Sequence, residues 1–133
     1  MRYLLDTNII IAAMKGHAAV RQRLETTPLS ALLLSPVVLG ELEFGAEKSA
    51  QPERNRARLA ELTERLPLAA LDAETSQCYG RIRAALEKQG TTIGANDMWI
   101  AAQALALGAV MVTDNSREFG RVEGLVVENW VEG

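Results

Sequence analysis

Tyr3-Leu4-Leu5-Asp6-Thr7-Asn8 is the stretch that decides the fold, because three apolar residues run directly into an acidic turn. The apolar residues predict a short buried strand, and the pattern after the turn predicts a helix from about Ile9 to Met14. Asp6 would then lie at the carboxyl end of a strand and the amino end of a helix, where open α/β sheets bind their ligands. Its carboxylate could also serve as a helix N-cap, and the two roles are compatible.

Strand-like apolar runs and helical segments alternate along the rest of the chain. The further runs expected as strands are Leu32 to Leu34, Leu68 to Leu71, Val110 to Val112 and Leu125 to Glu128. The further helices are expected over residues 18–25, 37–48 and 53–66, from Asp72 or Thr75 to residue 89, and over residues 96–107. This order predicts an α/β fold with a mostly parallel sheet of four or five strands and helices on both faces.

Length and composition set limits on the class of protein. With 133 residues, 48% of them hydrophobic, the chain can bury a sizeable core, and we expect one domain over residues 1–133. The net charge of −3 excludes a uniformly basic nucleic-acid-binding protein, so any nucleic-acid contact must be local. The single cysteine, Cys78, excludes an internal disulfide framework. No apolar stretch approaches the roughly 18 residues needed to span a bilayer, so we expect a cytoplasmic protein without membrane contact.

Four acidic residues fall where such a fold would bring them together. Asp6 and Asp114 each end an apolar run, and Glu41 and Asp97 interrupt the apolar faces of expected helices. Two carboxylates about 5 Å apart repel each other by about 3 kcal/mol at an effective dielectric constant of roughly 20. A hard cation removes that cost, and Mg²⁺ is the natural candidate, with Mn²⁺ able to replace it. The pattern therefore predicts a bound divalent cation and phosphoryl chemistry.

Each of these acids also has a purely structural interpretation. Glu41 lies on the apolar stripe of its helix and needs a partner, so a salt bridge to Arg2 or Lys48 is the alternative. Asp97 could compensate a helix dipole, and Asp114 could belong to a turn. Four such coincidences at strand ends and helix faces favour a shared site.

The histidine content limits the chemistry further. Acid–base catalysis without a metal usually needs two groups that titrate near neutrality, and histidine is the usual choice. The only histidine, His17, follows Gly16 in an expected helix break, where we expect a solvated loop residue. The sequence therefore argues against a histidine mechanism.

Four segments, in this order, carry a resemblance to a known family. They are Leu5-Asp6-Thr7-Asn8, Gly40-Glu41-Leu42-Glu43-Phe44-Gly45-Ala46, Gly94-Ala95-Asn96-Asp97-Met98-Trp99-Ile100-Ala101-Ala102 and Val112-Thr113-Asp114-Asn115-Ser116-Arg117-Glu118-Phe119. They resemble the PIN domain, specifically the VapC toxins of bacterial toxin–antitoxin pairs, and the similarity covers essentially the whole chain. It implies a Mg²⁺-dependent endoribonuclease with Asp6, Glu41 and Asp97 at the three leading acidic positions.

The fourth acidic position departs from the family's pattern. Many relatives carry an acid where this chain has Asn115, and Asp114 stands at a more variable site. The resemblance therefore leaves the fourth residue open between Asp114 and Asn115.

The mechanism that we expect assigns a role to each of these residues. Asp6 and Asp97 hold the metal, Glu41 orients or deprotonates the attacking water, and Asp114 or Asn115 tethers a water or a second ion. Cleavage should leave a 5′-phosphate and a 3′-hydroxyl. Four neighbouring side chains are expected to aim the carboxylates by hydrogen bonds, and they are Thr7, Asn8, Asn96 and Thr113.

The resemblance also implies partners. They are an RNA substrate, for which initiator tRNA is the suggestion, a second copy in a homodimer, and a VapB-type antitoxin that carries a basic residue to the acidic site. Operator DNA would be bound only through the antitoxin. Arg117 and the arginines of the 53–66 helix are candidates for RNA contact, with a solvated helix face as the alternative. Trp99 and Trp130 are expected to pack in the core or at an interface.

Two other classes of function stay open. A phosphatase of the haloacid dehalogenase type would want a second aspartate at position 8, where this chain has Asn8. A non-catalytic PIN-like module that binds RNA or protein would be expected to lose one acidic position. The presence of three leading acids argues against such a module.

Overall fold

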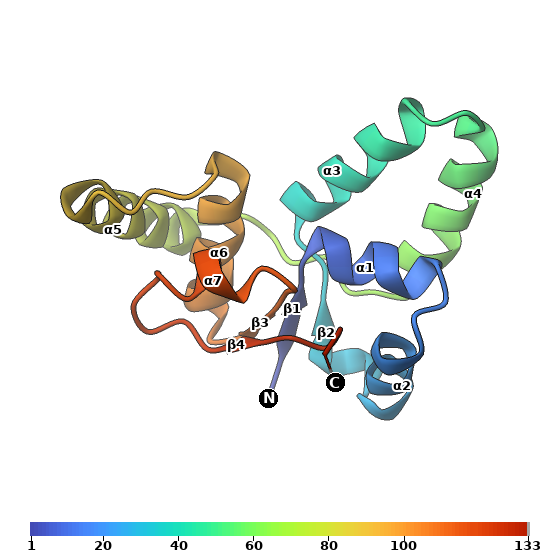
Figure 1. Cartoon of the computed structure of the whole chain (residues 1–133), viewed down its shortest axis with the longest axis horizontal. Coiled ribbons are helices and arrows are strands. Elements are labelled where there is room, and N and C mark those ends of the chain that lie inside the picture. Colours follow the sequence, from blue (N-terminus) through green and yellow to red (C-terminus); the bar gives the residue numbers. More distant parts are fainter. Residues whose placement is uncertain (133) are drawn as a thin grey trace.

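The computed structural model describes residues 1–132, and its centre is a parallel β-sheet (Figure 1). The strands lie in the order β2-β1-β3-β4 and span Leu32–Leu33, Tyr3–Leu5, Val110–Val112 and Val127–Glu128. Every neighbouring pair is parallel, so the carboxyl ends of all four strands lie at one edge of the sheet. The predicted α/β fold with a mostly parallel sheet is confirmed.

The helices connect and cover these strands. They are α1 (Thr7–Met14), α2 (Ala18–Thr26), the short 3-10 helix η1 (Leu29–Ala31), α3 (Pro36–Glu47), α4 (Pro52–Thr63), α5 (Ala73–Gln89), α6 (Ala95–Leu107) and α7 (Ser116–Phe119). Ser35 caps α3 with its hydroxyl, and Gly90 and Gly108 end α5 and α6 in the left-handed conformation that favours glycine. None of the helices within residues 1–132 is long and apolar enough to cross a membrane.

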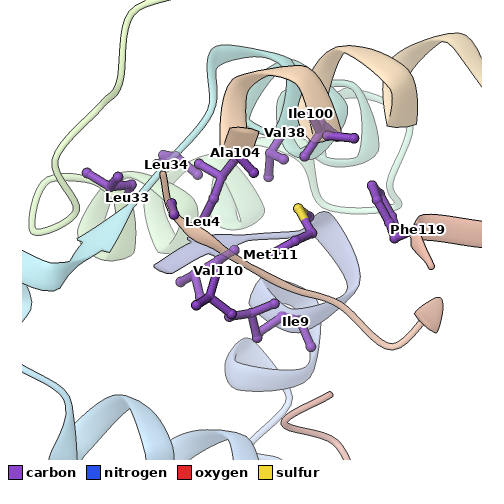
Figure 2. Close-up of a cluster of buried hydrophobic side chains, with 14 of the residues drawn as sticks. Leu4, Ile9, Leu33, Leu34, Val38, Ile100, Ala104, Val110, Met111 and Phe119 are labelled. Carbon is purple, nitrogen blue, oxygen red and sulfur yellow. The ribbon is translucent and has the colours of Figure 1, made fainter. Parts of the chain in front are cut away.

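The core lies on both faces of the two central strands. Leu4 of β1 and Met111 of β3 have no exposed surface. Figure 2 shows Ile9 of α1 on one side of these strands and Val38 of α3 and Ile100 of α6 on the other. Because both faces are covered, the strands read as continuous apolar runs rather than alternating ones, as parallel strands usually do.

Three details of the predicted elements were wrong. Residues 68–71 form no strand, because Leu34 makes only an isolated parallel bridge with Leu68, and the carbonyls of Ala69 and Ala70 accept hydrogen bonds from Gln103 at 2.9 and 3.1 Å. The last strand begins at Val127 instead of Leu125. The turn after β3 continues into the short helix α7, which the sequence reading missed.

Candidate active site

Asp6 joins the end of β1 to the start of α1. Its backbone N–H donates to the carbonyl of Val112 at 2.9 Å, so β3 fixes its position. Oδ1 accepts from the Thr7 backbone N–H at 2.8 Å, and Oδ2 accepts from the Thr113 hydroxyl at 2.7 Å. Burial raises the pKa of Asp6 and these two bonds oppose the rise, while the charges of Glu41 and Asp114 add to it. Asp6 is therefore the N-cap of α1, as the sequence suggested, and its carboxylate also lies near other acidic side chains.

Glu41 reaches the same place from the middle of α3. Its Oε1 accepts a hydrogen bond from the Thr7 hydroxyl at 2.8 Å. The alternative salt bridges are absent from residues 1–132, because Arg2 donates to the carbonyl of Leu107 and the Lys48 ammonium lies over the ring of Phe44. A neutral hydroxyl orients Glu41 without neutralising its charge.

Asp97 lies in the first turn of α6, where no side chain caps the helix. Burial and, to a smaller extent, the charges of Asp6, Glu118 and Glu41 raise its pKa to about 6. The first turn of a helix favours an anion, so the dipole role proposed for this residue also holds. The charges of Asp6 and Glu41 nevertheless both act on Asp97, which places the three leading acids near one another.

Asp114 and Asn115 point to different partners. The exposed Asp114 accepts a hydrogen bond from the Asn8 side chain at 3.2 Å, and its charge acts on Asp6. The Asn115 side chain caps α7, and its Nδ2 donates to the Glu118 carboxylate at 2.6 Å. The Asn115 amide is therefore engaged by α7, and Asp114 is the charged member of the pair that acts on Asp6.

Glu118 is a site residue that the sequence reading missed. It is half-buried, and its charge raises the pKa of Asp97, after burial and the charge of Asp6. The signal was present, because Asn115 followed three residues later by Glu118 is the capping-box pattern of a helix start. The expectation of a simple turn at Asp114 concealed that pattern.

The expected hydrogen-bonding residues behave unequally. Thr7 holds Glu41, Thr113 holds Asp6, and Asn8 contacts Asp114. The Thr113 hydroxyl also accepts from the backbone N–H of Asn115 at 3.0 Å, so the turn after β3 is tied to Asp6. Asn96 is exposed, and among the described residues its side chain makes no hydrogen bond with these acids.

Other residues singled out in the sequence have structural roles. His17 is half-buried and caps α2, because its Nδ1 accepts from the Val20 N–H at 3.3 Å. Arg58 donates to the carbonyl of Met14 at 2.9 Å, and Arg56 pairs with Glu47. The tryptophans pack as expected, with Trp130 fully buried and Trp99 stacked on Tyr79 at 3.9 Å between ring centroids; Arg117 is exposed.

The donor set fits a hard divalent cation. Carboxylate oxygens are the ligands that Mg²⁺ prefers. Burial and neighbouring negative charges raise the pKa values of Asp6 and Asp97, and a bound cation would offset both costs of keeping these groups ionised. Within residues 1–132, no three Asp, Glu, His or Cys side chains already converge closely enough to form a complete metal site. Mg²⁺ usually keeps water and substrate phosphate among its ligands, so it does not require three protein ligands that already converge.

The sequence and structure match known proteins over nearly their full lengths. A PIN-domain family model matches residues 3–125. The chain is 41% identical over 131 residues to the tRNA(fMet)-specific endonuclease VapC of Shigella flexneri. It is 38% identical over 132 residues to Ribonuclease VapC2 of Rickettsia felis. Each alignment covers 98% of this chain and 98% of the relative. The chain belongs to the VapC ribonucleases of the PIN-domain family.

A solved VapC structure supports this assignment. The DNA-bound VapBC complex from Salmonella typhimurium contains a chain that matches with a TM-score of 0.92 at 38% identity, covering 98% of both chains. The VapC assignment confirms the family indicated by the four sequence segments and excludes the dehalogenase-type phosphatase. It also identifies the chain as a ribonuclease toxin of the toxin–antitoxin type.

Proposed function

We propose that residues 1–133 form one PIN domain that cleaves RNA with Mg²⁺, or Mn²⁺ in its place, held by Asp6 and Asp97. One observation carries this proposal: Asp6, Glu41 and Asp97 come from three separate elements, and the charge of Glu41 raises the pKa of both Asp6 and Asp97. A folded protein keeps such repulsion only where function or a counter-ion offsets it. The VapC family supplies the reaction class, and the acids supply the site.

The residues of the site divide the chemical work. Asp6 is fixed by Thr7 and Thr113 and presents a rigid anion beside Asp97. The Thr7 hydroxyl engages Oε1 of Glu41, so Oε2 is left to orient the attacking water and accept its proton. When bound, the cation supplies charge neutralisation and lowers the pKa of a bound water. In-line attack on the phosphodiester leaves a 5′-phosphate and a 3′-hydroxyl.

The fourth catalytic position is assigned to Asp114. Its charge acts on Asp6, and Asn8 holds it. Asn115 acts indirectly, because it caps α7 and binds the Glu118 carboxylate near Asp97. Thr7, Asn8 and Thr113 position the carboxylates, and no contact supports the same role for Asn96.

The partners follow from the family and from one groove. We propose initiator tRNA as the substrate, as for the Shigella flexneri relative, and action in the cytoplasm without membrane contact. A groove of about 320 Å³ has apolar walls that include Ile11, Met14 and Leu42, and Glu41 lies at its edge. We assign it to a VapB-type antitoxin segment that brings a basic residue to the acids, within a complex of VapC homodimers that contacts operator DNA only through the antitoxin.

RNA-end mapping tests this function. The purified protein is incubated with total tRNA in Mg²⁺ or EDTA, and the 5′ ends are sequenced; Asp97→Asn is the inactive reference and Glu123→Gln, an exposed acid, is the matched control. We expect one dominant new 5′-phosphate end, only with metal, from the wild type and Glu123→Gln. Cleavage that persists in EDTA, or in Asp97→Asn, would contradict the proposal.

A further inference from the structure

Phe44 is an aromatic side chain that the fold leaves in water. It is 64% exposed on α3, whereas the other phenylalanine, Phe119, has no exposed surface. A fully buried phenylalanine gains about 1.5 to 3 kcal/mol relative to an exposed one, so the protein forgoes most of that gain at Phe44. Single exposed apolar residues are common, and the surroundings of this one decide its meaning.

The ring lies beside the acidic site and carries a cation. Phe44 follows Glu41 by three residues, so the two are neighbours on the helix surface. The Lys48 ammonium lies 4.9 Å from the centroid of the Phe44 ring. Gly40 lies one helical turn before Phe44 and is exposed. A Cβ added at Gly40 would meet no atom within 4 Å. The ammonium lies over the ring and both residues are exposed, so a ligand from solvent can contact the ring and the ammonium together.

The surroundings of Phe44 do not suit a second protein chain. Its neighbours on α3 include Glu43 and Glu47, and Glu47 is paired with Arg56. A stable protein–protein interface buries about 800 Å² on each partner around an apolar centre. The apolar surface of one ring among glycine and charged residues is far smaller than such an interface. An aromatic face beside a cation is instead the combination that binds an unpaired nucleotide, with the base on the ring and the phosphate at the cation.

We propose that Phe44 and Lys48 form a nucleotide platform on which a base flanking the cut site stacks while Lys48 contacts the adjoining phosphate. This inference rests on the proposed RNA cleavage and adds a specificity determinant to it. In Figure 1, α3 begins beside the carboxyl ends of the strands and runs away from them. RNA held at Glu41 therefore meets Phe44 as it leaves the acids, and a base can stack there only if it is unpaired.

Steady-state cleavage of a synthetic RNA tests the platform. The probe is a labelled single-stranded oligonucleotide that spans the mapped cut site, used with Mg²⁺. Phe44→Ala should raise KM about tenfold and leave kcat within about twofold, since base–aromatic stacking spans this range. Phe44→Tyr should keep the wild-type KM, and Lys48→Gln should reduce the salt dependence of binding by about one phosphate contact. Leu29→Ala is the control, because Leu29 is also exposed but precedes β2 at the opposite edge of the sheet.

Abasic RNA separates stacking from other effects. The same oligonucleotide with the base removed at one flanking position should bind the wild type about tenfold more weakly and Phe44→Ala no more weakly than intact RNA. If Phe44→Ala keeps the wild-type KM, or loses equally on intact and abasic RNA, the platform is disproved while RNA cleavage stands. A change in the sedimenting mass of Phe44→Ala would instead assign the ring to an interface between copies. A wild type that cuts neither total tRNA nor this oligonucleotide would remove the proposed function and this inference with it.

Discussion

Two carboxylates of the site are held by threonine hydroxyls, which orient a charge without cancelling it. Thr113 donates to Asp6, and Thr7 donates to Glu41. An arginine or lysine in either place would form an ion pair and compete with a metal cation for the same oxygens. The neutral donors thus keep the acids available and leave their repulsion in the folded protein. This repulsion can be measured as a difference in the free energy of unfolding.

Asp97 gives the clearest stability prediction. Its pKa in the folded protein, about 6, lies above the ordinary value of 3.8. The stabilisation that this raised pKa provides is fully present below pH 3.8 and is lost as pH rises through about 6. In EDTA at pH 8, Asp97→Asn should therefore be more stable than the wild type by about 1 kcal/mol, a value reduced for partial exposure.

Urea denaturation at pH 8 and pH 4 measures this difference, with Glu123→Gln as the control. The advantage of Asp97→Asn should shrink at pH 4, where the wild-type carboxyl is largely protonated. Adding Mg²⁺ at pH 8 should stabilise the wild type more than the mutant. An Asp97→Asn protein that is less stable at pH 8 would show that Asp97 makes a structural pair instead.

Asp114 and Asn115 should separate into catalytic and structural roles. Asp114→Ala should lower single-turnover cleavage about tenfold, less than Asp97→Ala, and leave the melting temperature unchanged because Asp114 is exposed. Asn115→Ala should cost about 1 kcal/mol of stability through the lost cap of α7. The double mutant should combine the activity loss of Asp114→Ala with the stability loss of Asn115→Ala. Full activity of the double mutant would remove this turn from the active site.

At the level of secondary structure, the sequence predicted the elements that carry a local signal. The strand ending at Asp6 and the helix starting after Ser35 were both clear, because apolar runs and caps mark them. The segment after Pro67 reads as a strand by composition, yet a contact 34 residues away, from Gln103 to Ala69, decides its conformation. Likewise the sequence was enough to propose Asp6, Glu41 and Asp97 as site residues, whereas the approach of Glu118 to Asp97 depends on how α7 packs.

Gln103 should prove important for packing the connection between α4 and α5. Its side chain is fully buried, and its amide is the donor for the carbonyls of Ala69 and Ala70. Gln103→Leu should destabilise the protein by about 1 to 3 kcal/mol, because it leaves these carbonyls without their donor. Urea denaturation measures the loss, and Gln89→Leu, at the exposed end of α5, is the control. Equal stabilities for the two variants would contradict this role.

The molecule as a whole has a net charge of −3 and gathers acids where RNA must bind. The polyanionic substrate is therefore repelled from the site unless a cation intervenes. Of the arginines of α4, Arg56 pairs with Glu47, whereas Arg58 donates to the uncharged carbonyl of Met14 and keeps its charge. In the proposed mechanism, the divalent cation would therefore assist RNA binding as well as catalysis.

Metal dependence without histidine dependence is the expected behaviour of the whole protein. Cleavage should stop in EDTA and return with Mg²⁺ or Mn²⁺, and RNA binding should weaken in EDTA as well, because uncompensated acids repel the phosphates. His17→Asn should retain full activity and fold, since asparagine can replace the imidazole as the cap of α2. Cleavage rates and filter binding, measured with and without metal, test both statements. Products with 2′,3′-cyclic phosphate ends would contradict water attack, and a loss of cleavage in a folded His17→Asn protein would restore histidine to the mechanism.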